Sequence, residues 1–396
     1  MAGWIPKIFG GARTPVGVDV GARSIKAVQL RPLSGGRWAV AASASIPRSA
    51  AEDAAVAGAQ PAAVTAPLAT GEVERLHDVL RRQGFGGSGV VLAIPSSRLL
   101  SASLELPPRS SNAPVDSIAR AEFARAHKLP LEAPNFEFAH WELPAAARGG
   151  RTSQALAVGC THADADAVLR PFDEDGLDVV ALDVEAWALA RACGSLAAPP
   201  GRVTALLDMG WNACRLVVVH HRTVCYTRLL TDAALRHLHR AVGQHLGLEP
   251  EVARHVLEDA ALWAAGHGGD APGDAAGERS GESANESSPA VDVRRIVWAH
   301  FDAMIAELRT SFSYAAHQYP DAPLQRLLLT GGGAVIPGAA EYLREALGIE
   351  ARVARPADVA ECPAGFAAAP ASMTALGLAM FADADGAAEN SGEVRA

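Results

Sequence analysis

Cysteine is scarce in this sequence and never occurs as a C-x-x-C pair. The 396-residue chain contains five cysteines, an odd number. Scattered, unpaired cysteines predict neither a disulfide framework nor a zinc cluster, and they are typical of a reducing compartment. We therefore expect a cytoplasmic protein. The five are Cys160, Cys193, Cys214, Cys225 and Cys362.

Excess positive charge and long apolar runs are missing as well. Lys and Arg number 35 against 44 Asp and Glu, giving a formal net charge of −9, which disfavours nucleic acid as a partner. No apolar run approaches the length that spans a bilayer. Residues 1–15 carry positive charge but a broken apolar stretch, so we expect an arm rather than a secretory signal. A small membrane-surface anchor is the alternative for this arm.

What the chain does have is the composition of a folded globular protein. Hydrophobic residues make up 49% and charged residues 20% of it. A chain of this length exceeds what one compact core accommodates, so it predicts two or more domains. Residues 266–290 contain almost nothing that can be buried, which predicts a disordered, mildly acidic loop. The polar residues 382–396 predict a flexible tail.

One strand-turn-strand pattern occurs twice. The runs VGVDV, SIKAVQL and RWAVAASASIP predict three strands, with Asp19 and Gly21 at the first bend. The run GRVTALLDMGWNACRLVVVHHRTVCYTRLL predicts the same three strands, with Asp208 and Gly210 at the equivalent bend. Two matching hairpins in two halves of a chain predict two related domains.

Between the two hairpins, strand and helix signals alternate in a block that the first domain does not need. We interpret this block as an inserted α/β subdomain in the first half of an α/β protein. The expected divisions are an arm at 1–15, a first domain at 16–87, the insertion at 88–178, a return to the first domain at 179–200, and a second domain at 201–381.

Glycine and aspartate at these bends have a chemical reason. Glycine lets the backbone approach a phosphate closely, and Asp19 and Asp208 are suited to hold Mg²⁺ through its water shell. Lys26, on the strand after the first bend, can neutralise a phosphate. A third glycine turn follows the predicted strand LQRLLLT, at residues 331–333. The pattern predicts a two-sided phosphate clamp that a later glycine turn closes over a base.

Other candidates have simpler structural explanations. Asp183 and Glu185 precede a predicted helix, where carboxylates favour the N-terminal turn, and orienting an attacking water is the alternative. We interpret Cys214 as a packing residue of a strand rather than as a nucleophile, because no partner base is identifiable. Five histidines look like a cluster, but two of them, His237 and His239, lie two apart on a predicted helix and face different ways, which disfavours a metal site. The five are His220, His221, His237, His239 and His245.

Three stretches resemble a known superfamily. VGVDVGARSIKAVQL, ALLDMGWNACRLVVV and LLLTGGGAVIPGAAEYLREALGI resemble the two phosphate motifs and the adenosine motif of the actin-like ATPases. Within that superfamily, residues 16–381 look like the PilM family of type IV pilus assembly proteins, which are related to the cell-division protein FtsA. The resemblance implies an actin-like (ribonuclease H-like) two-domain fold with an inserted α/β subdomain.

The resemblance also implies site residues and a cofactor, ATP with Mg²⁺. Asp19 and Asp208 would lie near the metal, and Glu307 would face the ribose. The residues implied to contact the nucleotide are Asp19, Gly21, Ser24, Lys26, Asp208, Gly210, Glu307, Gly331, Gly332 and Gly333.

The resemblance implies a partner too. The insertion would bind the cytoplasmic tail of a PilN-like inner-membrane protein, so that the chain is cytoplasmic, peripheral to the inner membrane and in contact with other components of a pilus or related secretion platform. Membrane contact would then be indirect, through the partner.

The chain departs from the family pattern in both phosphate motifs. Ala22 and Arg23 stand where relatives carry small hydroxyl residues, and Trp211 is large enough to crowd a γ-phosphate. These losses favour at most a weak ATPase, and the alternative is a degenerate scaffold that no longer binds nucleotide. A sugar kinase is a further alternative, but no Asp stands out as its general base. An FtsA-like filament former would carry a C-terminal amphipathic helix, which residues 382–396 do not resemble.

Overall fold

The computed structural model describes residues 13–48, 68, 70–87, 89–131, 135–144, 152–258 and 289–381. Residues 266–288 of the predicted loop 266–290 and the predicted tail at 382–396 lie outside the described residues, as does most of the predicted arm. Pro289 and Ala290, predicted as the end of the loop, are the first residues of a helix.

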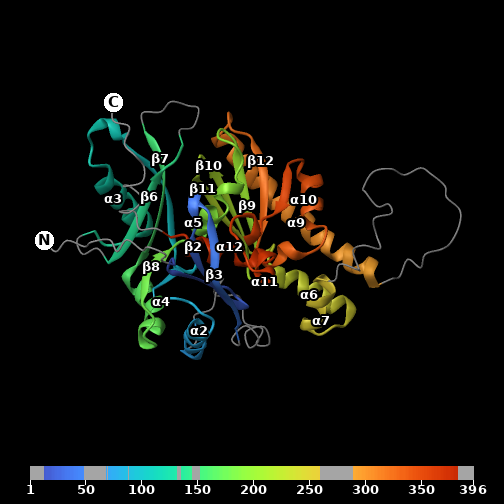
Figure 1. Ribbon diagram of the computed structural model, residues 1–396. Helices are drawn as coiled ribbons and strands as arrows, with labels where there is room; N and C mark the ends of the chain where they lie inside the picture. The colour runs from blue at the N-terminus through green and yellow to red at the C-terminus, as the bar shows by residue number, and fades with distance from the viewer. Residues whose placement is uncertain are drawn as a thin grey trace.

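Two five-stranded sheets of the described chain have the same strand order (Figure 1). The first sheet runs β3-β2-β1-β4-β8 and the second sheet runs β11-β10-β9-β12-β13. In both, the first three strands of the order are antiparallel to one another and the last three are parallel. The bounds are β1 Val16–Val20, β2 Ser24–Pro32, β3 Trp38–Pro47, β4 Val90–Ala93, β8 Val179–Asp183, β9 Val203–Met209, β10 Cys214–His220, β11 Thr223–Leu230, β12 Leu324–Thr330 and β13 Glu350–Val353.

The period-two alternation of the strands gives each sheet two different faces. On β1, Val16 and Val18 enter the core on the outer side of the sheet, so Gly17 and Asp19 point to the opposite face. Alternation therefore puts each aspartate of the repeated hairpins on the inner face of its own sheet.

Two helices, α5 (Glu185–Ala192) and α12 (Met373–Ala379), form a layer between the sheets. One hydrophobic cluster joins them to Val28 of the first sheet and to Val217 of the second sheet. This layer connects the two halves of the molecule.

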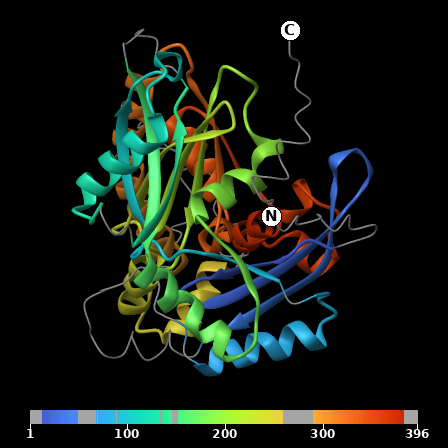
Figure 2. The same cartoon turned by 90° about the vertical axis from the view of Figure 1, so that its left-hand side faces the viewer.

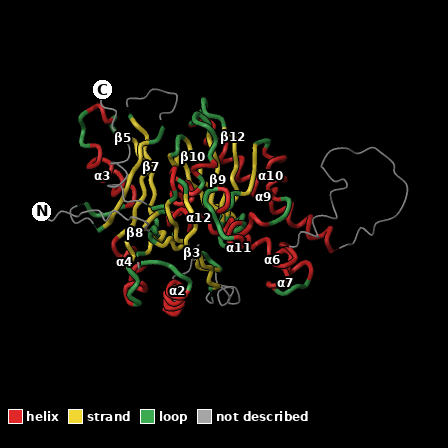
Figure 3. Tube along the Cα trace, in the orientation of Figure 1, coloured by secondary structure: helices red, strands yellow, loops and turns green. Residues whose placement is uncertain are grey.

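Further helices cover the outer faces (Figures 2 and 3). The first sheet packs against α2 (Thr70–Arg82) and α4 (His162–Glu174). The second sheet packs against three others. These are α6 Leu235–Leu246, α9 Pro289–Gln318 and α10 Ala339–Leu347, with α7 Pro250–Glu258 beside α6 and the short α11 Ala364–Ala367 before α12.

A three-stranded sheet with the order β5-β7-β6 forms a separate layer with α3 (Val115–His127). Its core contains Phe123 and Phe136. The strands are β5 Leu100–Leu106, β6 Phe136–Glu142 and β7 Ser153–Thr161.

Some residues of the predicted insertion, 88–178, belong to the first sheet and its core rather than to the separate three-stranded layer. β4 lies inside the first sheet, between β1 and β8, and Phe172 of α4 is buried in the core of that sheet. The short apolar run of β4 has the same appearance whichever sheet it joins, because periodicity reports burial and not the identity of the neighbouring strand.

Candidate functional site

The first hairpin positions Asp19 opposite Lys26. The two residues are register partners on β1 and β2, and the Lys26 Nζ lies 3.0 Å from the Asp19 Oδ2. The Gly21 amide donates to the Ser24 carbonyl at 3.0 Å and closes the bend. A Cβ at Gly21 would lie 2.9 Å from the Lys26 Nζ, so glycine leaves room for the ion pair.

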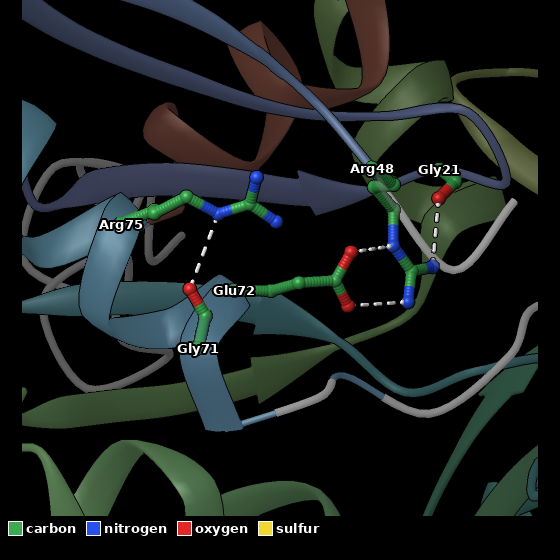
Figure 4. A network of polar contacts seen from close by, with 5 residues as sticks. All are labelled: Gly21, Arg48, Gly71, Glu72 and Arg75. Carbon is green, nitrogen blue, oxygen red and sulfur yellow. Dashed lines mark hydrogen bonds and ion pairs between the residues drawn. The ribbon is translucent and has the colours of Figure 1, made fainter.

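A buried ion pair holds this bend from behind (Figure 4). Arg48, just after β3, donates to the Gly21 carbonyl at 3.0 Å. Its guanidinium also makes two 3.0 Å bonds with the Glu72 carboxylate of α2, and both side chains are 1% exposed. The Arg48 amide donates to the Arg23 carbonyl at 2.9 Å. The conformation of the bend is therefore fixed by side chains that sequence reasoning did not single out.

The second hairpin repeats the first with a different cation. Arg215 is the register partner of Asp208 on β10, at the offset of seven that separates Asp19 and Lys26. Arg215 also donates to Ser96 at 2.6 Å and forms an ion pair with Glu185. The sequence analysis did not single out Arg215. The signal was its position seven residues after Asp208, which equals the position of Lys26 relative to Asp19.

The tips of the two hairpins meet. The guanidinium carbon of Arg23, in the first bend, lies 4.5 Å from the ring centre of Trp211, in the second. The pKa of Asp208 is raised to about 6, first by burial and next by the negative charge of Asp19, while Arg215 and Lys26 oppose the shift. The structure thus gathers the two aspartates and their two cations in one place, as the matching bends predict.

The glycine turn after β12 lies against the second aspartate. Gly331 has a φ of +81°, and a Cβ there would lie 2.6 Å from the Asp208 Oδ1. The Thr330 hydroxyl donates to that same oxygen at 3.2 Å. Gly333 is buried against Leu235, whereas a Cβ on Gly332 would meet no atom within 4 Å. Gly332 is therefore the position in this turn with space beside its backbone.

Glu307 lies apart from this group. Its carboxylate pairs with Arg228 on β11, the edge strand of the second sheet, and Arg228 also donates to the Ser311 hydroxyl at 3.1 Å. The contacts of Glu307 are thus with residues of β11 and α9 and not with the glycine turn.

The remaining carboxylates that the sequence singles out have structural partners. Asp183 accepts from the Val184 amide at 2.7 Å and pairs with Arg191. Glu185 accepts from Ser96 at 3.1 Å besides its ion pair with Arg215. Both carboxylates are thus engaged in ion pairs and hydrogen bonds within the protein.

Cys214 is a packing residue. Its Sγ donates to the Ala233 carbonyl at 3.0 Å, and burial raises the pKa of the thiol to about 12. Because the thiolate is the reactive form, this cysteine is inert. Of the histidines, His239 packs edge-on against Trp211 with ring centres 4.7 Å apart.

The donor set fits Mg²⁺ together with a nucleotide better than Mg²⁺ alone. Among the described residues, no group of three or more His, Cys, Asp or Glu side chains is placed to hold a metal ion. Mg²⁺ is commonly held by one or two carboxylates plus substrate phosphates and waters. Asp19 and Asp208 are the two carboxylates of this site that could take that role.

One feature reduces the phosphate-binding capacity of the second bend. The first amides of α6, those of Leu235 and Arg236, donate to the carbonyls of Gly210 and Trp211, each at 3.1 Å. Amides at a helix N-terminus are a common phosphate site. Here the two amides already donate to carbonyls of the bend.

None of the helices in the described part of the chain is both long and apolar enough to cross a bilayer.

The family model described as "Type IV pilus assembly protein PilM" matches residues 17–235 of the chain. No curated protein matches the chain. Among solved structures, the chain is similar to one described as "PilM-PilN type IV pilus biogenesis complex", at 20% identity and a TM-score of 0.69. That match covers 93% of this chain and 98% of the other.

Two further solved structures share the architecture. The ethanolamine utilization protein EutJ from Carboxydothermus hydrogenoformans is 16% identical with a TM-score of 0.51, over 94% of this chain and 90% of that one. MreB5 of Spiroplasma citri bound to ADP is 12% identical with a TM-score of 0.50, over 96% and 100%. These likenesses confirm the predicted actin-like fold.

Proposed function

Because the chain belongs to the PilM family of type IV pilus assembly proteins, we propose that it is an adaptor of the inner-membrane platform of a type IV pilus or a related secretion machine. The proposal has two parts, a nucleotide site between the hairpins and a docking site on the inserted subdomain. The observation that carries it is the pair of equivalent bends, each with an aspartate opposite a cation, facing one another in a chain of this family.

The nucleotide part of the proposal is Mg²⁺-ATP bound between the two sheets. Asp19 and Asp208 would hold the hydrated metal, which neutralises the phosphates. Lys26 would contact the phosphates from the first sheet, and Gly332 offers open space for the adenosine. The bends would direct backbone amides at the phosphates, with the Ser24 hydroxyl as a further donor.

Hydrolysis would be weak at most. The carboxylates closest to the role of a water-orienting base, Asp183 and Glu185, are each held by an arginine. The nucleotide would then act through binding, by joining the two sheets, more than through turnover.

The docking part of the proposal is the cytoplasmic tail of a PilN-like inner-membrane protein on the inserted subdomain. β5 is an edge strand of the three-stranded sheet, and an edge strand offers unpaired backbone groups to an extended peptide. A surface cavity of about 600 Å³ lies beside it, lined by β5 and α3 residues that include Ser103, Glu105 and Arg125. Through such a tail the protein would sit in the cytoplasm against the inner membrane.

Calorimetric titration of Mg²⁺-ATP tests the nucleotide part. Wild-type protein should bind, and Asp19→Ala should bind at least tenfold more weakly, because a metal ligand and the partner of Lys26 are lost. The matched control is Asp78→Ala, which removes the exposed carboxylate paired with Arg82 on α2 and should bind as the wild type does. Absence of heat in every protein would contradict the proposal.

A synthetic tail of the PilN-like partner tests the docking part. Ala126→Trp would place a bulky ring in the cavity beside β5 and should weaken binding of the tail at least tenfold. Ser117→Trp, on the same helix but outside the cavity lining, is the control and should leave binding unchanged. Equal binding by both variants would move the docking site elsewhere on the molecule.

A scaffold that binds the tail but no nucleotide is a second candidate. It is favoured by one observation: the helix amides at the second bend already donate to its carbonyls. The two titrations separate the candidates, because the scaffold gives heat with the tail and none with Mg²⁺-ATP.

A further inference from the structure

The contact between Arg23 and Trp211 lies at the tips of both hairpins. Arg23 belongs to the bend between β1 and β2, and Trp211 to the bend between β9 and β10. The 4.5 Å between the guanidinium carbon and the ring centre is a cation–π contact. It joins the two sheets at the place where the motifs of the superfamily carry small residues.

The backbone of each bend is fixed by a hydrogen bond from another segment. The Arg23 carbonyl accepts from the Arg48 amide at 2.9 Å, and the Trp211 carbonyl accepts from the Arg236 amide at 3.1 Å. His239, on α6, packs against the Trp211 ring. The contact therefore joins two fixed bends rather than two mobile loops.

No group fits between these two side chains. Atoms in van der Waals contact are about 3.5–4.0 Å apart, and the guanidinium is already within 4.5 Å of the ring centre. A phosphate at the tips has to displace one side chain or the other.

The order of groups along the site determines which phosphate this affects. The glycine turn lies against Asp208 and Met209, the residues directly before the second bend, and each aspartate precedes its own bend in the chain. A nucleotide whose adenosine sits at the glycine turn would pass its first phosphates along the aspartates and their cations. The terminal phosphate of a triphosphate would arrive at Arg23 and Trp211.

We propose that Arg23 and Trp211 set the number of phosphates that the site accepts, so that a nucleoside diphosphate binds more tightly than the triphosphate. This inference rests on the proposed nucleotide site. A diphosphate fits with the contact intact, whereas a triphosphate binds after the contact has been broken. The two residues are specificity-determining and take no part in any chemical step.

The test is calorimetric titration of Mg²⁺-ADP and Mg²⁺-ATP into wild type, Arg23→Ala, Trp211→Ala and the double variant. Wild type should bind ADP at least tenfold more tightly than ATP. Each single variant should lower that ratio at least threefold by improving ATP binding, with ADP affinity changed less than threefold. The double variant should resemble the single ones, because all three remove the same contact.

The matched control is Arg31→Ala, which removes an exposed arginine from the same hairpin and should leave the ratio unchanged. Trp211 also packs in the core of the second sheet, so melting curves accompany each titration. If Trp211→Ala fails to fold, Arg23→Ala carries the test by itself.

Two results overturn the inference while leaving the nucleotide site intact. One is an unchanged ratio in Arg23→Ala. The other is weaker ATP binding in that variant, which would make Arg23 a ligand of the terminal phosphate. Absence of binding by ADP and ATP in every variant is the separate result that overturns the nucleotide site and this inference with it.

Discussion

At the scale of single residues, the candidate site depends on side chains that lie behind it. The Arg48 guanidinium donates to the Gly21 carbonyl and also forms an ion pair with Glu72. Both charged side chains are buried. Removing one partner of such a pair leaves an uncompensated buried charge, which is more costly than the pair itself is stabilising.

Glu72→Ala should therefore lower the free energy of unfolding by about 3–5 kcal/mol. Asp78→Ala, which breaks an exposed pair on the same helix, should cost less than about 1 kcal/mol. Urea unfolding measures both. Similar losses in the two variants would show that Arg48 finds another partner and that the bend does not depend on Glu72.

The raised pKa of Asp208 predicts that the stability of the protein depends on pH. The pKa of this carboxyl rises from 3.8 to about 6 in the folded protein, so in that window the folded state holds a proton that the unfolded state lacks. Stability from this group is greatest below the unfolded pKa and falls as the pH rises through about 6. Above that, the desolvated negative charge of this half-buried carboxylate is a constant penalty.

Asp208→Asn removes this penalty, because the amide is neutral at every pH. In buffer without metal or nucleotide, the melting temperature of the variant minus that of the wild type should be higher near pH 7 than near pH 4. Asp78→Asn is the exposed control and should show no such trend. An equal difference at both pH values would contradict the raised pKa.

The residues of the site differ in how far sequence predicts them. Asp19, Lys26 and Asp208 follow from the repeated bend, and Arg215 follows from its offset once the repeat is recognised. Arg48 and Glu72 do not, because nothing in either segment indicates that they meet. The ion pair of Glu307 with Arg228 could not be predicted from the sequence either, because it depends on how α9 crosses the second sheet.

At the scale of elements, close backbone approach fixes α12 between β1 and α5. A Cβ on Gly377 would lie 1.9 Å from the Ala188 carbonyl oxygen, and one on Gly17 would lie 2.2 Å from the Ala375 carbonyl oxygen. Both obstacles are backbone atoms, which cannot rotate away as a side chain can.

Gly377→Ala should accordingly destabilise the protein by about 1–3 kcal/mol or more, because the crossing of two helices has to widen. Gly71→Ala is the control, since a Cβ there meets no atom within 4 Å, and it should change the free energy of unfolding by less than about 1 kcal/mol. Thermal or urea unfolding decides the matter. Equal stability of Gly377→Ala and wild type would mean that the crossing is loosely packed.

Elements were more predictable than their assignment to sheets. The strands of both hairpins follow from apolar alternation and from the glycine at each bend. The start of the insertion did not, because β4 is a short buried strand whose partners, β1 and β8, lie far away in sequence.

At the scale of the whole molecule, the two sheets are joined by polar contacts as well as by the α5 and α12 layer. Arg215 of the second sheet contacts Ser96 and Glu185, which follow strands of the first sheet. Since both charged side chains are less than one-fifth exposed, this ion pair is shielded from solvent and salt.

Arg215→Ala should increase the radius of gyration in solution scattering and lower stability by about 1.5–3 kcal/mol, because charged hydrogen bonds across the two sheets are lost. Arg228→Ala breaks the more exposed pair with Glu307 inside one half of the molecule. It should leave the radius of gyration unchanged and cost less than about 1 kcal/mol. The same compactness in both variants would show that the α5 and α12 layer and the Arg23–Trp211 contact hold the halves together without Arg215.

The position of α12 has a consequence for how the chain matures during synthesis. This last described helix fills the inner face of the sheet that begins at Val16. The core of this sheet therefore stays incomplete until α12, which lies far downstream of β1 in the sequence, has been synthesised. Shortening the gene before the codon for Met373 would leave the N-terminal half, although intact in sequence, without its closing wall and exposed to aggregation.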